Sequence, residues 1–496
     1  MNSKIINNFH LLYESNINND IETYIYFSIL SIIKINNPNI IYFYYYNIPN
    51  GKLWNKIKDK LTLKKIDIPK IYENNIDIYF KKYRYIIIYK ELIENGGIYI
   101  NLNTLSIQPL KELLHNSFIK SNNNEIIACE KKSKIACEFY KYHISNKDIE
   151  YDNNFSKNID LHKDIKILVD NFKYDDDKIY DIIFKEIYDY SFSLLFHLFK
   201  NNYFISLGNN NLDKINLYDV FNKITVYNLL VKKILVYNFI NSNIVLINKN
   251  NYELINNIDK IYWINLEKSI DRKNNMIDIL KNFNVENIRI KAIDGNLEKN
   301  INEKYFYSID NNYPNYSNKE YAILLSHLNT IDNYINIPLS ELKYGYAIIM
   351  EDDISLDFIN YWNKDLKNII ENAPIDWDII MLGYFSLKNN NIIYKKWDNE
   401  WSAISYLINH KSSQKINNLK IDQKWKCSSY DIMVSDNYIF SKLNTYIYKY
   451  PYFTFPNNND STFHEDHLEY HKLYKISNYI TLNNIYNEHI NEHINE

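Results

Sequence analysis

The stretch YGYAIIMEDDISL at residues 344–356 constrains the fold more than any other part of the chain. Its apolar run at 347–350 predicts a buried strand of a parallel sheet, and the strand ends in three adjacent carboxylates, Glu351, Asp352 and Asp353. Like charges this close raise one another's pKa, so the side chains must diverge into water or share a cation. Oxygen ligands of this kind suit Mg²⁺ or Mn²⁺. Because ligands bind at the carboxyl ends of strands in open α/β sheets, we predict a metal and substrate site here. An acidic turn after a core strand is the alternative.

The length of the chain, 496 residues, is too great for one ordinary core and predicts two or three domains. A net charge of -3 gives no indication of a nucleic-acid-binding protein. The cysteines, Cys129, Cys137 and Cys427, are too few and too irregularly spaced for a disulfide framework or a zinc site. This cysteine usage favours a reducing compartment.

The amino terminus, MNSKIINNFHLLYESN, lacks the basic segment, apolar core and small-residue cleavage site of a signal peptide. The longest apolar run near it, residues 24–33, ends at Lys34 and is too short to span a bilayer. We therefore expect a soluble, cytoplasmic protein without a transmembrane segment.

The first 115 residues alternate between strand and helix patterns. They predict a strand at 40–47, a helix at 83–97 that stops at two glycines, and a strand at 98–102. Two segments, NNPNIIYFYYYNIPNGKLWNKIKD and ELIENGGIYINLNTLSIQPLKEL, are similar to the sugar-binding DXD glycosyltransferases related to family 32. In that family the strand after the Gly-Gly-Ile-Tyr turn carries two aspartates that hold a metal on a nucleotide-sugar. Asn101 and Asn103 stand at those positions here.

The preceding helix departs from the family pattern as well, because an expected Asp and Arg align with Tyr85 and Ile88. An amide supplies an oxygen to a divalent cation but no charge, so it replaces a carboxylate poorly. We interpret residues 1–250 as a glycosyltransferase fold that has lost metal-dependent catalysis and serves as a scaffold domain.

The region from 116 to about 255 shows only helix and strand patterns that complete the first domain. No apolar strand leads into the acidic run at 175–177, which is therefore predicted to be a solvated loop. The Asn-rich segment at 248–259 is the predicted linker.

The patterns sharpen from Lys260 onward. KIYWINLEKSIDRKNNMIDILKNFNV predicts a strand, a turn containing Asp271 and Arg272, and an amphipathic helix. NIRIKAIDG predicts a second strand that ends at Asp294 and Gly295. This βαβ opening, with a charged tip at each strand end, suits a nucleotide.

The segment SNKEYAILLSHLNTI opens with Ser317 and Glu320 in the spacing of a capping box. Helical periodicity places Glu320, Leu324, His327 and Ile331 on one face of the helix. A lone histidine in such a place is usually a core histidine, and a site residue is the alternative.

Taken in this order, the pieces resemble glycosyltransferase family 25, which includes bacterial lipooligosaccharide galactosyltransferases and collagen hydroxylysine galactosyltransferases. The resemblance covers about residues 258–471 and rests on YWINLEKSIDR, KAIDG, EYAILLSHL, AIIMEDDI, DWDIIMLGY, AISYLIN, VSDNYIF and YPYFTFPNNNDST. The collagen enzymes also carry two tandem transferase-like domains. Composition and motif style further resemble glycosyltransferases of giant amoeba-infecting DNA viruses.

The resemblance to family 25 implies a GT-A fold, a UDP-sugar donor, Mn²⁺ (or Mg²⁺) and inversion at the anomeric carbon. It implies that Glu351 and Asp353 hold the metal, which neutralises charge on the leaving UDP, while a separate carboxylate takes the acceptor's proton. Asp436 and Asp460 are the candidates for the base or for acceptor contact. The residues predicted to bind substrate or nucleotide are Asn265, Asp271, Arg272, Asp294, Gly295, Glu320, His327, Asp352 and Asp378, the last with stabilisation of the site as an alternative role.

The tail STFHEDHLEYHKLYK places His464, His467 and His471 at helical spacing, one residue short of an HExxH motif. Because a carboxyl-terminal histidine completes the metal shell of some GT-A enzymes, the resemblance makes His464 a candidate metal ligand. The repeat NEHINEHINE predicts a low-complexity tail at 481–496.

We therefore expect an α/β protein of two tandem GT-A, Rossmann-like domains, at 1–250 and 256–480. The second is predicted to move galactose or glucose from a UDP-sugar to a hydroxyl of a glycan or protein acceptor, with collagen-like hydroxylysine among the candidates. A catalytically inactive carbohydrate-binding or scaffold protein is the alternative. A nucleotidyltransferase or phosphodiesterase would need more carboxylates nearby and a phosphate-binding glycine loop, and the sequence shows neither.

Overall fold

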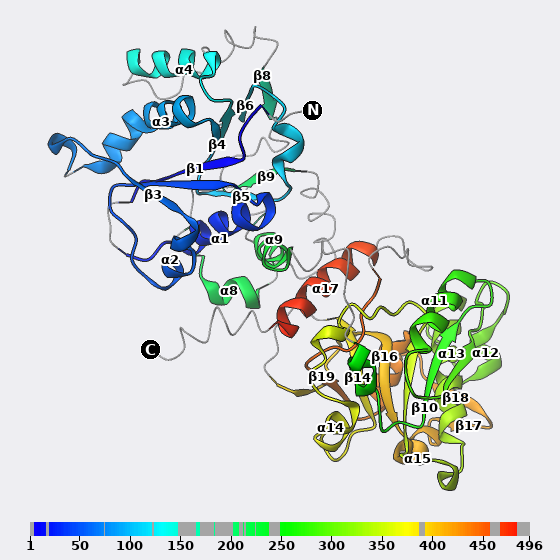
Figure 1. Ribbon diagram of the computed structural model, residues 1–496. Coiled ribbons are helices and arrows are strands. Elements are labelled where there is room, and N and C mark those ends of the chain that lie inside the picture. The colour runs from blue at the N-terminus through cyan, green and yellow to red at the C-terminus, as the bar shows by residue number, and fades with distance from the viewer. Residues whose placement is uncertain are drawn as a thin grey trace. The chain divides into compact units, whose positions relative to one another are not determined.

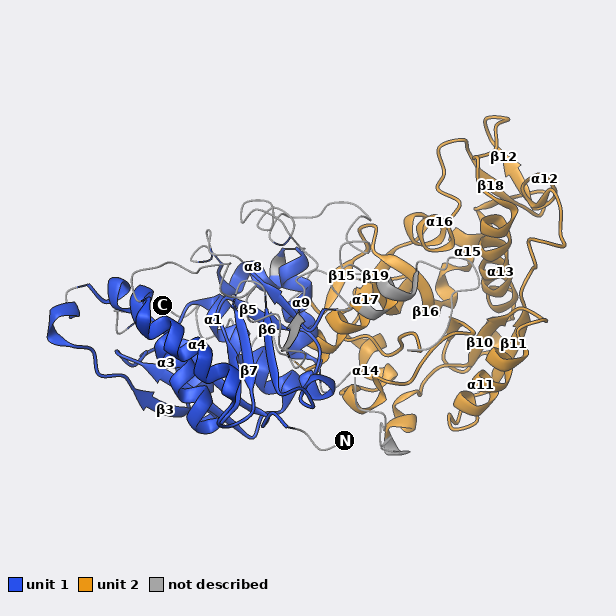
Figure 2. Ribbon diagram, turned by 90° about the horizontal axis from the view of Figure 1, so that it is seen from above, with its two compact units in different colours: residues 1–238 blue, residues 239–496 orange. Residues whose placement is uncertain are grey.

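The computed structural model describes residues 4–15, 19–73, 75–121, 124–146, 165–168, 183, 202–207, 212, 215–223, 225–237, 249–385, 392–456 and 467–483. The chain divides into two compact units, residues 1–238 and 239–496 (Figure 2). Both are mixed α/β units built on a seven-stranded sheet. Of the helices described, none combines the length and the apolar character needed to cross a bilayer.

Unit 1 has a sheet in the order β3-β2-β1-β4-β7-β6-β8, and β5 and β9 pair separately. The pairs β1/β2, β2/β3 and β1/β4 are parallel, and β4/β7 is antiparallel. The elements are β1 (Asn8–Tyr13), α1 (Thr23–Ser31), η1 (Ile32–Asn36), β2 (Ile40–Tyr45), α2 (Lys52–Ile57), η2 (Lys58–Lys60), β3 (Thr62–Lys65), η3 (Lys70–Tyr72), α3 (Ile76–Asn95), β4 (Gly97–Ile100), β5 (Thr104–Ser106), η4 (Leu110–Leu113), β6 (Phe118–Ser121), β7 (Ile126–Cys129), α4 (Lys134–Ser145), β8 (Ile165–Leu168), β9 (Phe204–Ser206), α8 (Leu217–Asn222) and α9 (Val226–Leu235).

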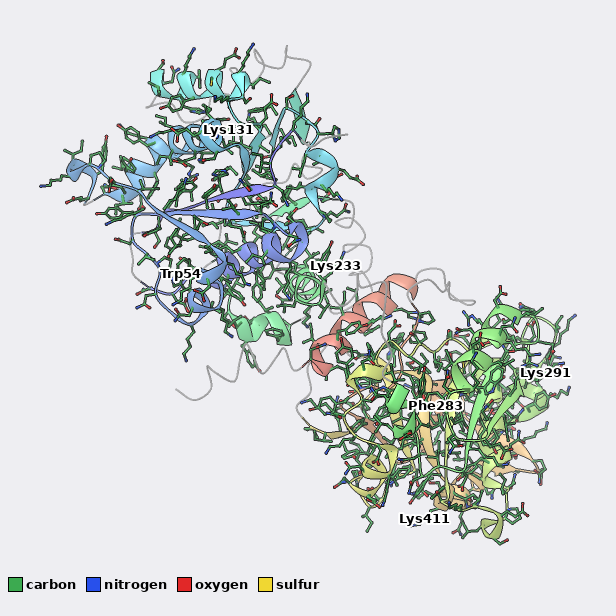
Figure 3. All side chains as sticks on the ribbon, viewed as in Figure 1. Trp54, Lys131, Lys233, Phe283, Lys291 and Lys411 are labelled. Atoms are coloured by element: carbon green, nitrogen blue, oxygen red, sulfur yellow. The ribbon has the colours of Figure 1, made fainter. Side chains whose placement is uncertain are left out.

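Helices cover both faces of this sheet, with α3 and α4 on one side and α1 and α2 on the other (Figure 1). Trp54, labelled in Figure 3, is 3% exposed and packs its ring 5.1 Å from that of Phe43 in the sheet. The predicted stop of α3 is confirmed, because Gly96 and Gly97 follow the helix with φ of 65° and 119°. A Cβ on Gly97 would lie 2.5 Å from the carbonyl oxygen of Asn8, so the turn from α3 into β4 requires glycine.

Unit 2 has the strand order β11-β10-β13-β16-β14-β19-β15, with a small separate sheet β12-β18-β17. The elements are η6 (Lys249–Leu254), β10 (Lys260–Asn265), α11 (Ile270–Leu280), β11 (Asn287–Lys291), α12 (Ile301–Tyr305), β12 (Phe306–Ser308), α13 (Asn318–Ile335), η7 (Leu339–Glu341), β13 (Tyr346–Glu351), η8 (Ile359–Tyr361), α14 (Leu366–Glu371), β14 (Ile379–Phe385), β15 (Tyr394–Lys396), β16 (Trp401–Asn409), η9 (His410–Ser412), α15 (Ser413–Asn417), β17 (Lys420–Ile421), β18 (Lys424–Cys427), α16 (Ser435–Lys442), β19 (Thr445–Tyr448) and α17 (His467–Leu482).

The predicted strand before the three acids is present as β13, but its sheet is mixed rather than parallel. β13 pairs in parallel with β10 and in antiparallel fashion with β16. The strand is nonetheless buried on both faces, because Ala347 and Ile349 join one core cluster and Ile348 and Met350 join another. Phe283, labelled in Figure 3, belongs to the second cluster with α11 and α14, whereas α13 and α16 contribute to the first. Burial on both sides explains the continuous apolar run.

The predicted linker is wrong for residues 249–259, which are packed into unit 2. Ile255 and Ile258 are 2% and 4% exposed and belong to its core, and the Asn251 side chain donates to the carbonyl of Ile359. The acidic run at 175–177 and the end of the tail, residues 484–496, lie outside the described residues.

Helix α17 packs against the segment that follows the three acids. Lys475 is buried and pairs with Asp357, and the ring of Tyr479 lies 5.0 Å from that of Phe358. In the same segment, Ser355 forms an isolated antiparallel β-bridge with Thr454. These contacts fix the path of the chain immediately after the acids.

Candidate active site

The three acids lie at the topological switch point of unit 2. From β10 the chain passes to β11 on one side and then returns to β13 on the other, and all three strands are parallel. The carboxyl ends of β10 and β13 therefore meet at one edge, between crossovers that leave in opposite directions. In open α/β sheets such a switch point is where ligands bind.

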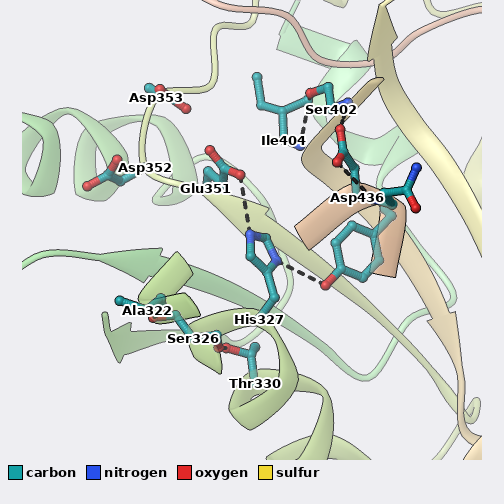
Figure 4. Close-up of polar contacts among 12 residues, drawn as sticks. Ala322, Ser326, His327, Thr330, Glu351, Asp352, Asp353, Ser402, Ile404 and Asp436 are labelled. Carbon is teal, nitrogen blue, oxygen red and sulfur yellow. Dashed lines mark hydrogen bonds and ion pairs between the residues drawn. The ribbon is translucent and has the colours of Figure 1, made fainter. Parts of the chain in front are cut away.

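The three carboxylates diverge into different surroundings (Figure 4). Asp352 accepts from the Asn265 amide at 2.5 Å and from Nη1 of Arg272 at 3.1 Å. The same Nη1 lies 3.3 Å from Oδ2 of Asp353, and Glu351 turns instead toward His327. The structure thus brings together the predicted residues Asn265, Arg272, Asp352 and Asp353 and makes Arg272 the cation that the crowded acids share.

Asn265 is fixed in this network from both sides. Its Oδ1 accepts from Nε of Arg289 at 2.9 Å, which leaves its amide nitrogen to donate to Asp352 and to the carbonyl of Ser269. Arg289 on β11 also approaches Glu267 at 3.4 Å. One continuous set of hydrogen bonds therefore runs from β11 through β10 to the end of β13.

Asp353 is the least compensated of the acids. Its side chain is 13% exposed, and Oδ1 is buried without a hydrogen-bond partner among the described residues. Burial, reinforced by the charge of Glu351, raises the pKa of Asp353 to about 8 even though Arg272 opposes the shift. Burial also raises the pKa of Asp352, against the hydrogen bond from Asn265. A buried oxygen of this kind is favourable only if a cation or donor arrives.

Asp436 stands in the first turn of α16, close enough to Glu351 for that charge to affect it. Its two oxygens accept from the backbone nitrogens of Ser402 at 2.7 Å and Asn437 at 2.8 Å. Burial is the main cause that raises the pKa of Asp436, and the charge of Glu351 adds to it. Ser402 has φ of 103°, a conformation that costs a non-glycine residue free energy, and the bond to Asp436 holds it.

The remaining predicted residues near this edge have local partners. Asp294 pairs with Lys268 at 2.7 Å, and that hydrogen bond lowers the pKa of Asp294. A Cβ on Gly295 would lie 2.7 Å from the carbonyl oxygen of Asn318, so glycine lets this turn pack on the start of α13. Asp271 is exposed in the first turn of α11.

The predicted capping box of α13 is confirmed. Ser317 accepts from the backbone nitrogen of Glu320, and the Glu320 carboxylate accepts from the backbone nitrogen of Ser317 at 2.7 Å. This use of the carboxylate accounts for Glu320 without a ligand. The structure therefore gives a local reason for a residue that was also predicted to bind substrate.

Asp378 is not brought together with the other acids. It precedes β14, beside the amino end of β13, because Ile379 and Ala347 both pair with Ile408 of β16. Its carboxylate is bonded to Ser412 at 2.6 Å, to Lys415 and to the backbone nitrogen of Asn444. This set of contacts ties Asp378 to η9, to α15 and to the residue before β19, at the opposite edge of the sheet. Asp460 and His464 lie outside the described residues, as does the side chain of His467.

The sequence analysis did not single out Arg289 or Tyr406. The rarity of arginine in this chain could have indicated Arg289. The chain has only three arginines, Arg84, Arg272 and Arg289, among 57 basic residues. Each contacts a carboxylate, and a planar guanidinium with a fixed fork of donors cannot be replaced there by lysine without losing geometry. Arginine in a chain this rich in lysine therefore marks positions that need a guanidinium.

Unit 1 has a corresponding switch point between β1 and β4, and its chemistry is different. Arg84 donates from Nε to Glu14 at 2.5 Å and from Nη2 to the other oxygen, so the two charges compensate each other at the end of β1. Asn103, at a predicted metal position, is 5% exposed and donates to Glu125. At this switch point, both described carboxylates, Glu14 and Glu125, have hydrogen-bond donors, unlike Oδ1 of Asp353 in unit 2.

The donor set in unit 2 fits a divalent cation that arrives together with a nucleotide. Glu351 and Asp353 are hard oxygen donors, and Oδ1 of Asp353 has no partner among the described residues. Within the described residues no three His, Cys, Asp or Glu side chains are grouped closely enough to hold a metal by themselves. Mg²⁺ and Mn²⁺ sites of this class take one or two carboxylates and complete their shell with substrate phosphates.

Fold and site together define an α/β protein with a cluster of carboxylates at a topological switch point. Residues 258–444 match the model of Glycosyltransferase family 25 (LPS biosynthesis protein), which supports a glycosyltransferase. The matched segment contains all the acids of the site and Asp436, and it ends before Asp460 and His464. No curated protein matches the chain.

Several solved structures show low similarity to the chain. The PaToxG glycosyltransferase is 15% identical with a TM-score of 0.20, over 29% of this chain and 64% of that one. The glycosyltransferase GlyE of Streptococcus pneumoniae TIGR4 is 12% identical with a TM-score of 0.24, over 58% of this chain and 75% of that one. Its apo form gives 12% identity and a TM-score of 0.27, over 57% and 75%. TM-scores this low do not define the fold of either unit.

Proposed function

We propose that unit 2 is a GT-A glycosyltransferase that moves galactose or glucose from a UDP-sugar to a hydroxyl of a glycan or protein, with inversion and with Mn²⁺ or Mg²⁺. The observation that carries the proposal is the buried Oδ1 of Asp353, which has no hydrogen-bond partner among the described residues, beside Glu351 at the switch point. The family 25 match over the same residues supports it. The acceptor class follows from that resemblance.

Each residue of the site has a role in the proposed reaction. Glu351 and Asp353 would hold the cation, which would supply Lewis-acid stabilisation of the charge that develops on the leaving group. Arg272 and Asn265 hold Asp352 in place, and Arg272 also steadies Oδ2 of Asp353. The acceptor oxygen bonds to the anomeric carbon as the bond to the diphosphate breaks, and UDP departs.

Asp436 is the proposed base that receives the proton of the acceptor hydroxyl. A general base works best when its pKa lies nearer the working pH than that of an ordinary carboxylate, and burial raises the pKa of Asp436 in that direction. Two backbone hydrogen bonds fix its orientation. Asp460 and His464 stay predictions for acceptor contact and for a further metal ligand.

Unit 1 is proposed to be a second GT-A domain without metal-dependent catalysis. The order β3-β2-β1-β4 places its switch point as in unit 2, and an antiparallel strand follows on the far side in each sheet. Amides at 101 and 103 and the compensated pair of Arg84 with Glu14 support a scaffold role.

The test is a measurement of UDP release by the full-length chain from UDP-galactose and UDP-glucose, with Mn²⁺ and with EDTA. Release with Mn²⁺ that EDTA abolishes is the expected result. No binding of UDP under either condition, by a folded protein, would overturn the proposal. Carbohydrate binding without UDP binding would instead identify an inactive carbohydrate-binding or scaffold protein.

A further inference from the structure

For His327 the sequence predicts a core histidine, with a substrate-site residue as the alternative, and the structure buries it behind one of the acids. Its side chain is 1% exposed in the middle of α13, and both ring nitrogens have partners. Nδ1 lies 3.1 Å from the hydroxyl of Tyr406, and Nε2 lies 3.2 Å from Oε1 of Glu351 (Figure 4). A ligand in the site would meet Glu351, which is 32% exposed, rather than the imidazole.

The two partners of His327 determine which ring nitrogen carries the proton. A carboxylate only accepts hydrogen bonds, whereas a phenol has one O–H to donate. Burial, with the charge of Glu351 adding to it, raises the pKa of Tyr406 far above its usual value, so the hydroxyl keeps its proton. The arrangement in which every group is satisfied has Tyr406 donating to Nδ1 and Nε2–H donating to Glu351.

The opposite tautomer is unfavourable in this place. With the proton on Nδ1, the lone pair of Nε2 would face a carboxylate oxygen at 3.2 Å, and Oε1 would lose its donor. Tyr406 is itself held on β16, opposite Ile349 of β13, and its ring packs 5.5 Å from that of Phe440. A rigid chain of side chains therefore ends on Oε1 of Glu351.

We propose that His327, oriented by Tyr406, is a positioning residue that holds the Glu351 carboxylate through Oε1 and leaves Oε2 for a divalent cation. This inference rests on the proposed function of unit 2. Hydrogen bonds from behind a metal-binding carboxylate fix its orientation, and their loss typically weakens metal binding 10- to 100-fold.

Two substitutions separate the two hydrogen bonds of His327. The amide nitrogen of glutamine can take the place of Nε2, so His327→Gln keeps a donor for Glu351. The amide oxygen of asparagine can take the place of Nδ1 as an acceptor, so His327→Asn keeps a partner for the Tyr406 hydroxyl and loses the bond to Glu351. His410→Asn is the matched control, because Nε2 of His410 donates to a backbone carbonyl, that of Ile337, on the opposite edge of the sheet.

The measurement is Mn²⁺ affinity in the presence of UDP, from the electron paramagnetic resonance signal of free Mn²⁺, for full-length proteins with wild-type melting. We expect His327→Gln and His410→Asn to bind within a few-fold of wild type and His327→Asn to bind 10- to 100-fold more weakly. If His327→Asn binds Mn²⁺ as wild type does, or if Gln and Asn weaken binding equally, the inference is overturned while the proposed function stands.

A second readout needs no metal. Long-range ¹H–¹⁵N spectra of the wild-type chain labelled at histidine report the tautomer of each ring, and His327→Gln identifies the signal by its disappearance. The Nε2–H form is expected, and the Nδ1–H form would contradict the inference directly. A wild type that releases UDP from a sugar donor without any divalent cation would remove the metal from the proposed function and this role of His327 with it.

Discussion

Arg272 stands 3.3 Å from one oxygen of Asp353, while the other oxygen of the same carboxylate is buried without a partner among the described residues. The guanidinium of Arg272 thus partners Oδ2 and leaves Oδ1 for a cation or another donor. Because Arg272 also bonds to Asp352, it holds the two neighbouring acids side by side. The arrangement of the acids therefore destabilises the folded protein until a cation binds.

Replacement of Asp353 tests whether this carboxyl group destabilises the metal-free protein. In the metal-free protein, Asp353→Asn removes a carboxylate whose pKa is raised from its unfolded value of about 4 to about 8, so folding no longer requires protonation or burial of a charge. Since one pKa unit corresponds to about 1.4 kcal/mol, we expect the free energy of unfolding at pH 7 to rise by roughly 1–4 kcal/mol. The gain should shrink as pH falls to 4 and below, where the acid becomes protonated in the unfolded chain as well. Chemical denaturation at pH 7 and pH 4 measures it, and a variant less stable than wild type at pH 7 would contradict the interpretation.

The variant Asp353→Asn should also lose turnover and metal binding. Turnover of a UDP-sugar should fall on the order of a hundredfold or more, because the charge that supports the cation at the leaving group is gone. The increase in melting temperature produced by Mn²⁺ with UDP should also shrink, since a ligand stabilises in proportion to its affinity for the native state. A variant that keeps both properties would show that the acids are only a polar turn.

Mn²⁺ binding should be confined to unit 2. With UDP present, the full-length chain is expected to bind a single Mn²⁺, and Asp353→Asn is expected to bind none. The reason is that unit 1 has Asn101 and Asn103 where carboxylates are needed, and Glu14 is compensated by Arg84. Asp278→Asn, at an exposed position in α11, is the control and should bind as wild type. Mn²⁺ that remains bound with UDP to Asp353→Asn would locate a metal site elsewhere, with unit 1 the first place to look.

Much of the local structure around the site could be predicted from sequence, because local patterns determine it. The apolar run before Glu351 gives β13, and the spacing of Ser317 and Glu320 gives the capping box of α13. The insertion of β16 between β13 and β14 could not be predicted, since strand order and direction depend on contacts far apart in the chain. The contact of His327 with Tyr406 spans 79 positions for the same reason.

The error at residues 249–259 has a different cause. Asparagine is so common in this chain that an Asn-rich segment resembles a linker even where it is packed. Ile255 and Ile258 are buried in the core and Tyr252 and Leu254 are partly buried beside them, but these few apolar positions stand among asparagines and charged residues that mask any helix or strand period. Compositional bias thus weakens the prediction of loops, while it strengthens the information carried by rare residues such as arginine.

His10 in unit 1 should make the stability of that unit depend on pH. The imidazole is 1% exposed between the hydroxyl of Tyr44 and the carbonyl of Gly96, each at 2.9 Å, and burial lowers its pKa from 6.5 to about 4. The unfolded chain therefore binds a proton between pH 6.5 and 4 that the folded unit does not, and stability falls as pH falls through this window. From pH 7 to pH 5 the loss from His10 should be about 2 kcal/mol.

The measurement for His10 is the midpoint of the thermal transition of unit 1 at the two pH values. His10→Gln keeps a donor for Gly96 and cannot be protonated, so its transition should change less between pH 7 and pH 5 than that of wild type. An equal change in both proteins would assign the pH dependence to other groups.

Asp436→Asn tests the proposed base. Removing a general base typically lowers turnover by about 10²–10⁴, and Asp436→Asn should do so while UDP and Mn²⁺ still bind, because Asp436 acts on the acceptor and not on the nucleotide. In the wild type, burial raises the pKa of Asp436, so transfer should increase with pH through a value above that of an ordinary carboxyl group. Asp431→Asn is the control, since Asp431 lies in the preceding loop and accepts from the backbone of Ser428 without contact to the acids of the site.

The structural contribution of Asp436 can be separated from its chemical one. Asparagine has one acceptor oxygen where Asp436 uses two, so the strained backbone of Ser402 or the nitrogen of Asn437 loses its partner. This change should lower the melting temperature moderately and leave the affinity for UDP with Mn²⁺ near that of wild type. If transfer by Asp436→Asn falls only in step with the fraction of folded protein, Asp436 supports Ser402 and the base must be sought among the other acids, with Asp460 the first to replace.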